Sequence, residues 1–211
     1  MSGVPPATTA SRTAPPETRR KQLIEATITS ISKHGISGTT LNKVTQEAGL
    51  SLGLVNFHFE SKEALLAATL MYLAEQHRSL WISKSLRADI GAASKLQAIV
   101  DAQFHPQICN RRKLAVWFAF FGESRHRKAY RRISGNVDLE RQSVTADLCA
   151  TIIAEGGYAS VSPEGVSQML EGLFDGLWLN ILMYPDRFTR QTGRDHVLSC
   201  LRLWFPSHFS G

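Results

Sequence analysis

Residues 39–66 read TTLNKVTQEAGLSLGLVNFHFESKEALL, and this stretch decides the fold of the N-terminal part of the chain. Threonine and serine often cap the start of a helix, and a glycine in the left-handed conformation often ends one. The sequence predicts three helix starts, at Thr39 or Thr40, at Ser51 and at Ser61. It predicts one helix end, at Gly49. We therefore expect two short helices, at about 41–48 and 52–58, followed by a long helix.

Two short helices joined by a glycine-containing turn form a helix-turn-helix, whose second helix has the right size for the major groove of DNA. Its polar side chains are of the types that contact base edges and phosphates. Gly53 leaves one face of the second helix flat, and Lys62 lies at a helix N-terminus, where backbone N–H groups favour a phosphate. The residues expected at the DNA interface are Thr39, Thr40, Lys43, Ser51, Leu52, Gly53, Asn56, Phe57, His58 and Lys62.

Three aromatic residues in this stretch leave alternatives open. Phe57 and Phe59 can pack in the core or stack on bases, and we expect packing. His58 can bind a phosphate or donate a structural hydrogen bond. A simple helical hairpin with solvated polar residues is the alternative for the whole stretch, but the turn, the caps and the helix lengths all favour DNA binding.

Composition places the chain among ordinary globular proteins. Of its 211 residues, 43% are hydrophobic and 20% are charged, and the net charge of +6 mildly favours a polyanionic partner. Three widely spaced cysteines, Cys109, Cys149 and Cys200, predict reduced thiols in a cytoplasmic protein and not a disulfide framework. No apolar run approaches the ~18 residues of a membrane span. Residues 1–16, rich in Pro, Ser, Thr and Ala, are expected to form a disordered arm.

The remainder of the chain is predicted to be helical, because apolar residues recur at three- and four-residue spacing between Gly and Pro breaks. The expected helices cover about 17–33, 41–48, 52–58, 62–86, 92–104, 112–124, 128–155, 163–183 and 189–205. The fold class is therefore all-α. We expect a helix-turn-helix DNA-binding domain at 17–62 and a ligand-binding and dimerisation bundle at 63–211.

The segment GLSLGLVNFHFESKEALL (49–66) resembles the DNA-binding domain of the TetR family of transcriptional regulators. Members share the pattern hydrophobic-x-x-His-Phe-x-x-Lys-x-x-Leu at the start of the fourth helix, which is matched in order by His58, Phe59, Lys62 and Leu65. The upstream segment RRKQLIEATITSISKHGISGTTLNKVTQEAG (19–49) is also similar. Further along, LAVWFAFFGESRHRKAYRRI (114–133) and EGLFDGLWLNIL (171–182) resemble the BetI branch, the repressors of choline and betaine pathways.

This resemblance implies a homodimer of about nine helices per chain that represses transcription. It implies binding to a near-palindromic operator in double-stranded DNA, and release when a small-molecule effector enters the C-terminal bundle. For the BetI branch the effector is choline or a related quaternary ammonium compound.

Aromatic residues and an acid in the predicted helices fit such an effector. A quaternary ammonium ion has no N–H to donate, so aromatic faces and a nearby carboxylate suit it. The residues expected to bind it are Trp117, Phe118, Phe121, Asp175 and Trp178. Asp175 lies in an otherwise apolar helix, one turn after Glu171, and its charge needs a partner. The alternative, which aromatic stripes more often follow, is that these rings are core and that Asp175 pairs with an arginine from the helices at 112–124 or 128–155.

No enzyme signature stands out in the chain: HExxH, GxSxG, a P-loop and GxGxxG are all missing from it. We therefore expect no catalytic activity, no metal site and no cofactor. The last two helices are expected to form a four-helix dimer interface, with a stripe made by Val197, Leu201, Trp204 and Phe205. The alternative to a repressor is a helical small-molecule-binding or enzymatic module without operator binding.

Overall fold

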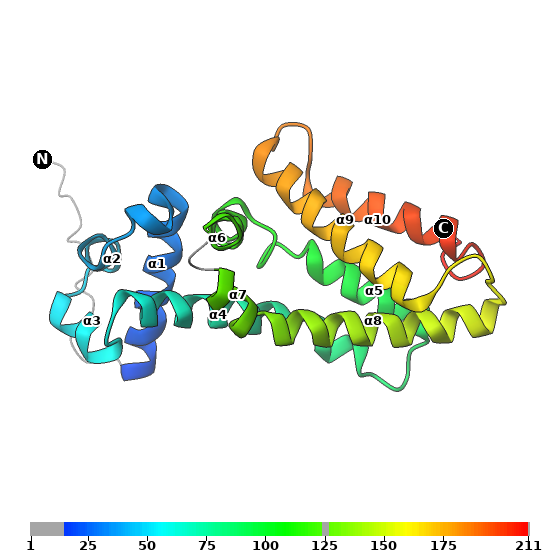
Figure 1. Ribbon diagram of the computed structural model, residues 1–211, viewed down its shortest axis with the longest axis horizontal. Coiled ribbons are helices and arrows are strands. Elements are labelled where there is room, and N and C mark those ends of the chain that lie inside the picture. The colour runs from blue at the N-terminus through cyan, green and yellow to red at the C-terminus, as the bar shows by residue number, and fades with distance from the viewer. Residues whose placement is uncertain (1–14, 124–126, 211) are drawn as a thin grey trace, which may run out of the picture.

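The computed structural model describes residues 15–123 and 127–210 of the chain. All regular secondary structure within these ranges is helical (Figure 1). The helices are α1 (Pro16–Gly38), α2 (Leu41–Ala48), α3 (Leu52–His58), α4 (Lys62–Ser85), α5 (Ala92–Gln103), α6 (Arg111–Gly122), α7 (Arg127–Ile133), α8 (Gly135–Gly156), α9 (Pro163–Met183) and α10 (Arg190–Trp204). The all-α prediction is confirmed, whereas the arm predicted at 1–16 lies almost wholly outside the described residues.

Local capping sets the boundaries of α2, α3 and α4. The Thr40 hydroxyl accepts a hydrogen bond from the Lys43 backbone N–H, so Thr40 is the cap of α2. Gly49 ends that helix with φ 63°, a left-handed conformation that costs glycine little. The hydroxyls of Ser51 and Ser61 cap α3 and α4 in the same way as Thr40 caps α2. Because these signals are local, the sequence predicted the bounds of α2 and α3, and the structure selects Thr40 over Thr39 as the cap of α2.

The N-terminal group consists of α1, α2, α3 and the first turns of α4, which share one apolar core (Figure 1). Val44 of α2 and Val55 of α3 are both 0% exposed, and Leu65 of α4 is 1% exposed. They pack with the apolar side of α1, which carries Ile28 and Ile31. This core holds α3 with its opposite face outward.

The C-terminal group is a bundle of α5, α8, α9 and α10 together with the later turns of α4 (Figure 1). Helix α8 packs along α9, α5 packs against α4 and α8, and α10 packs against α5 and α9. Helix α4 belongs to both groups, and α6 lies between them, in contact with α1 on one side and α9 on the other. Two helices therefore join the groups.

The single helix predicted at 128–155 is wrong, because the chain breaks there into α7 and α8. The break falls at Ser134 and Gly135. Serine and glycine have weak helix propensity, and Gly/Ser pairs are a common site of helix kinks. It lets α7 pack against α4 and α6 while α8 packs against α5 and α9. The described residues thus hold ten helices, one more than the nine expected.

The apolar stripe of α10 serves a different surface from the one predicted. Val197, Leu201 and Phe205 are each 0% exposed within the single chain, and Trp204 is half-buried. They pack into the protomer's own core, so they do not offer a face to a partner.

The three cysteines are free thiols, as predicted. Burial raises the pKa of both Cys109 and Cys149 to about 12, which makes them poor nucleophiles. None of the described helices combines the length and the hydropathy needed to cross a membrane.

Candidate functional site

The outer face of α3 and its surroundings carry most of the residues predicted to contact DNA. Thr40, Ser51, Gly53 and Asn56 are all exposed there. Leu52 is also open, at 44%, and lies on the side of α3 away from the buried Val55. Helix α3 contains no lysine or arginine, so this face is polar and apolar but not strongly basic.

Three of the predicted residues hold the end of α1 in place. The ammonium group of Lys62 donates to the Ile36 carbonyl at 2.9 Å, and that of Lys43 donates to the Gly38 carbonyl at 2.9 Å. Thr39 is 1% exposed, and its hydroxyl donates to the Gly35 carbonyl at 2.8 Å. A side chain that is this deeply buried cannot reach a phosphate directly, so the proposed DNA interface omits Thr39.

The aromatic residues at the end of α3 divide between surface and core. Phe59 is 5% exposed and packs in the core, whereas Phe57 is 76% exposed, so the expected packing of Phe57 is wrong. The half-buried ring of His58 touches both neighbours, with its centroid 5.1 Å from that of Phe57 and 6.4 Å from that of Phe59. Phe57 is the largest exposed apolar group on this face.

A cavity of about 190 Å³ lies in the C-terminal group, among α4, α5, α6, α8 and α9. Its walls are His77, Gln103, Trp117, Phe121, Asp138, Arg141, Gln142, Glu171, Phe174, Asp175 and Trp178. Four of the five predicted effector-binding residues are brought together here. Phe118 lies outside the lining, with its ring against that of Phe121 at 5.6 Å.

The lining carries an excess of negative charge. Three of its side chains are carboxylates and one is a guanidinium, that of Arg141. Arg141 donates two hydrogen bonds to Glu171, at 2.9 and 2.5 Å, and pairs with Asp138 at 3.2 Å. The arginine partner expected for Asp175 is thus present in the cavity, but its ion pairs are with Glu171 and Asp138.

The pKa values of two groups in the cavity lining, Asp175 and His77, are shifted by their surroundings. Burial raises the pKa of Asp175 to about 6, Glu171 adds to the shift, and Arg141 opposes it. Burial, and then the charge of Arg141, lowers the pKa of His77 well below its ordinary value. His77 is therefore neutral at pH 7, and Asp175 is largely ionised.

Sequence reasoning missed several lining residues because they come from helices with no aromatic stripe. His77 on α4, Gln103 at the end of α5 and Arg141 on α8 gave no local signal beyond being polar residues in amphipathic helices. The i, i+3 spacing of Asp138 and Arg141 could have indicated an ion pair, but not what it faces.

Comparison with known proteins finds matches for both the N-terminal group and the C-terminal group of helices. Residues 23–69 match the family described as "Bacterial regulatory proteins, tetR family", and residues 92–205 match "BetI-type transcriptional repressor, C-terminal". A protein of Paraburkholderia phymatum named HTH-type transcriptional regulator BetI is 35% identical over 175 residues, which cover 82% of this chain and 85% of that one.

The chain belongs to the TetR family.

Two solved structures show the shared fold of this TetR-family regulator. A putative transcriptional regulator from Pseudomonas aeruginosa PAO1 is 28% identical with a TM-score of 0.78, over 93% of this chain and 94% of that one. A putative regulator from Saccharomonospora viridis in complex with choline has a TM-score of 0.75 at 18% identity, over 88% and 96%. The relatives that match are named as transcriptional regulators and not as enzymes. The prediction of a TetR-type, BetI-like repressor is therefore confirmed.

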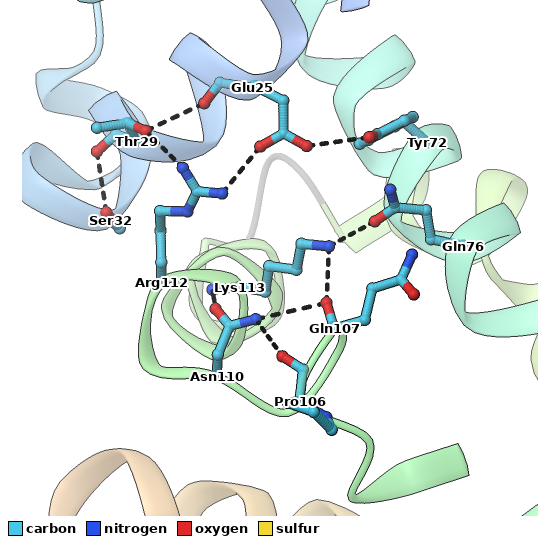
Figure 2. Close-up of polar contacts among 10 residues, drawn as sticks. All are labelled: Glu25, Thr29, Ser32, Tyr72, Gln76, Pro106, Gln107, Asn110, Arg112 and Lys113. Atoms are coloured by element: carbon cyan, nitrogen blue, oxygen red, sulfur yellow. Dashed lines mark hydrogen bonds and ion pairs between the residues drawn. The ribbon is translucent and has the colours of Figure 1, made fainter. Parts of the chain in front are cut away.

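In this TetR-family chain, α6 connects the cavity to the DNA-binding group. One side of α6 lines the cavity with Trp117 and Phe121. From the other side, Arg112 donates to Glu25 of α1 at 2.9 Å and to Thr29 of α1 at 3.0 Å (Figure 2).

Helix α4 is part of the same polar network. The Tyr72 hydroxyl donates to the other oxygen of Glu25 at 3.0 Å, so one carboxylate links α1, α4 and α6 (Figure 2). Beside it, the buried ammonium group of Lys113 donates to Gln76 of α4 at 2.5 Å and to the Gln107 carbonyl at 2.7 Å. A movement of α6 must therefore act on both helices that carry the helix-turn-helix.

Proposed function

We propose that this TetR-family protein represses transcription as a homodimer on a near-palindromic operator, and that a small organic cation, a quaternary ammonium compound, releases it. One observation carries the proposal. An aromatic cavity with excess carboxylates shares α6 with the polar network that holds α1 and α4. The DNA-binding domain is taken as 17–62 and the effector-binding and dimerisation domain as 63–211, with α4 common to both.

The composition of the cavity supports a cation. Trp117, Phe121, Phe174 and Trp178 offer ring faces, which attract a cation through their quadrupoles. The excess carboxylates supply the compensating charge, since Arg141 forms ion pairs with Asp138 and Glu171 and the cavity holds Asp175 as a third carboxylate. A quaternary ammonium ion suits such walls because it needs few hydrogen bonds to lose its water.

The size of the cavity supports a small effector. Its volume of about 190 Å³ is below the ~300 Å³ where drug-sized sites begin. It equals the volume of roughly six liquid waters. Choline, which is bound in the Saccharomonospora viridis structure, is a cation of this class.

The composition of the exposed face of α3 supports contacts to base edges more than strong electrostatic binding to the phosphate backbone. Asn56 can bond an adenine edge, and the exposed Leu52 and Phe57 can meet thymine methyl groups. We assign phosphate contacts to the exposed Thr40 and Ser51 around them. Lys43, Lys62 and His58 complete the proposed interface at its edge.

An exposed stripe on α9 supports the dimer. Met169 is 45% exposed, Leu179 is 44% exposed and Met183 is 58% exposed, and they recur at helical spacing with Gly172 and Gly176. Small residues between apolar ones let two helices approach closely. A dimer packed through α9 would fix the spacing between two copies of α3, as a palindrome requires.

Binding of cation and operator are opposed in this proposal. A cation against Trp117 and Phe121 displaces α6, and α6 then moves α1 and α4 through Arg112 and Lys113. Linkage requires that the effector and the operator weaken each other's binding by the same factor.

The test is fluorescence anisotropy of a labelled DNA that carries a palindrome from the DNA flanking this gene. The dimer should bind it with a steep salt dependence and with preference over scrambled DNA. Choline should then weaken binding at least tenfold, whereas its neutral carbon isostere, 3,3-dimethylbutan-1-ol, should not. Equal effects of the two compounds would overturn the cation, and an unchanged operator affinity with bound choline would overturn effector-driven release.

A further inference from the structure

A second hollow, an open cleft of about 690 Å³, lies where the segment between α5 and α6 meets the segment between α9 and α10. Its lining shares no residue with that of the cavity proposed for the cation. The two adjoin through Phe104, which lines the cleft and packs edge-on against Phe174 of the cavity, with the ring centroids 6.3 Å apart. The volume of the cleft is within the ~300–1,000 Å³ range of sites for small organic molecules.

One wall of the cleft is apolar. Phe104 is 5% exposed and Cys109 is 0% exposed. The half-buried Ile181 and Phe188 line the cleft with them, and these four residues are called the apolar wall. Gly193 of α10 allows the close packing behind it, because a Cβ atom there would lie 2.6 Å from the Phe104 ring. A ligand with a hydrocarbon body can lose its water against this wall, and each buried CH₂ group is worth about fourfold in affinity.

The charged side chains of the cleft have the opposite balance to those of the cavity. Three arginines and one carboxylate line the cleft, whereas three carboxylates and one arginine line the cavity. The carboxylate, Asp101, accepts a hydrogen bond from the Nε of Arg194 at 2.7 Å. Arg190, one turn earlier on α10, is exposed, and its side chain forms no ion pair or hydrogen bond within the described part of the chain. The guanidinium of Arg190 is therefore available to an anion from outside the protein.

Hydrogen bonds hold both loops that line the cleft. The Asn110 side chain donates to the Pro106 carbonyl at 3.0 Å (Figure 2). In the other loop, the Phe188 backbone N–H donates to the Tyr184 carbonyl at 2.9 Å, and Thr189 caps α10. The cleft is therefore preformed, so a ligand can bind without first ordering these loops.

An arginine beside an apolar wall selects one class of ligand. A guanidinium group binds a carboxylate through two parallel hydrogen bonds. An inorganic anion would leave the apolar wall exposed, and a neutral apolar molecule would leave Arg190 unpaired. A cation would be repelled by the excess positive charge.

We propose that this cleft is a second ligand site, which binds a small organic carboxylate with an apolar body through Arg190 and the apolar wall. The site goes beyond the proposed function and does not depend on its cationic effector, because the two linings have no residue in common.

The test is calorimetric titration of the full-length protein, without DNA, with octanoate, 1-octanol and acetate. Octanoate has both features of the proposed ligand, whereas 1-octanol has only the apolar body and acetate has only the carboxylate. Octanoate should bind at least about tenfold more tightly than either of the others. Equal binding of octanoate and 1-octanol would overturn the contact with the carboxylate, equal binding of octanoate and acetate would overturn the role of the apolar wall, and no binding of octanoate would overturn the site.

Variants of α10 locate the bound carboxylate. Arg190→Gln removes the charge and should weaken octanoate binding about tenfold or more. Arg190→Lys keeps the charge without the planar fork, so its affinity should lie between those of Arg190→Gln and the wild type. Arg202→Gln, exposed on the same helix but outside the lining of this cleft, should bind octanoate as the wild type does. Wild-type affinity in Arg190→Gln would overturn the assignment of the carboxylate to Arg190.

Competition with choline separates this site from the cavity of the proposed function. Excess choline should change the octanoate affinity by less than about threefold, because separate sites act nearly independently. An octanoate affinity that falls in proportion to the choline concentration would place octanoate in the cavity and overturn the second site. If choline itself does not bind, the cationic effector fails, while octanoate binding and its loss in Arg190→Gln still decide the second site.

Discussion

At the scale of single residues, Asp175 combines two demands that act against each other. Burial, and then the charge of Glu171, raises the pKa of its carboxyl group to about 6, so folding makes ionisation of this group harder than it is in the unfolded chain. A cationic effector favours the ionised form. Sites of this kind often trade stability for binding.

The first prediction concerns the pH dependence of effector affinity. Because the pKa of Asp175 is raised to about 6, choline affinity should be constant above pH 7 and should fall as the pH drops below about 6. In Asp175→Asn the affinity should be about fivefold weaker at pH 7.5, since a partly open ion pair is worth about 1 kcal/mol, and its pH dependence should be lost. Calorimetry at pH 5, 6 and 7.5 measures this, with the exposed Asp195→Asn as control; an unchanged profile in Asp175→Asn would assign the titration to another group.

The second prediction is that the Asp175→Asn substitution, which weakens effector binding, raises the stability of the ligand-free protein. An unfolded aspartate titrates near pH 4, so the raised pKa means that the folded state loses stability as the pH rises through about 6. Without ligand, Asp175→Asn should therefore melt at a higher temperature than wild type at pH 7.5, and at the same temperature at pH 4. Thermal denaturation followed by circular dichroism tests this, and a lower Tm at pH 7.5 would contradict it.

Asn56 carries the corresponding prediction at the DNA surface. Its exposed amide on α3 is suited to a bidentate contact with adenine, which is worth about 1–3 kcal/mol of discrimination. Asn56→Ala should weaken operator binding roughly 5- to 100-fold and leave binding to scrambled DNA and the Tm unchanged. The exposed Asn136→Ala on α8 is the matched control. Equal losses on both DNAs would mean that Asn56 contacts only the backbone.

At the scale of elements, α6 is the part that both ends of the molecule share. Its cavity side consists of aromatic rings and its other side of cations bound to α1 and α4. Burial, and then Glu25, raises the pKa of Tyr72 to about 12, so its hydroxyl keeps the proton that it donates to Glu25 across the physiological range.

We therefore predict that Arg112→Met uncouples the two sites. The substitution removes the bonds to Glu25 and Thr29 but leaves the cavity intact, so choline affinity should stay within about twofold. The weakening of operator binding by choline should shrink to less than about threefold. Anisotropy titrations with and without choline measure this, and the neighbouring exposed Arg111→Met should behave as wild type. Full release by choline in Arg112→Met would show that the signal passes elsewhere.

At the scale of the whole molecule, the surface left open by the protomer predicts the assembly. The apolar stripe expected to face a partner on α10 is largely buried in the protomer's own core, whereas α9 exposes Met169, Leu179 and Met183. Both helices bury one side in the protomer, but α9 exposes three large apolar side chains at helical spacing, whereas the exposed apolar residue of α10 is Leu203.

The prediction at this scale is that Leu179→Arg yields a folded monomer. A charge at the centre of an α9 interface leaves it unpaired on association, which is costly. The loss of one half-site contact should then weaken operator binding roughly 100-fold or more. Sedimentation velocity and anisotropy test both effects, with Leu86→Arg, 70% exposed at the end of α4, as control. A dimeric Leu179→Arg would move the interface off α9.

Sequence alone determined the features whose causes are local. The caps Thr40, Ser51 and Ser61 and the left-handed Gly49 act within a few residues of themselves, so the helix-turn-helix and its family could be identified directly. Helix periodicity also placed Trp117, Phe121, Asp175 and Trp178 on suitable faces, and these four do line one cavity.

Tertiary structure decided what periodicity cannot express. A helical pattern shows which residues share a face, but not which other helix that face meets. Only packing showed that Arg141 pairs with Glu171, that α10 turns its stripe inward, and that Thr39 is buried. It also brought His77 of α4 and Gln103 of α5, which gave no signal in the sequence, into the lining of one cavity, because burial there depends on five helices at once.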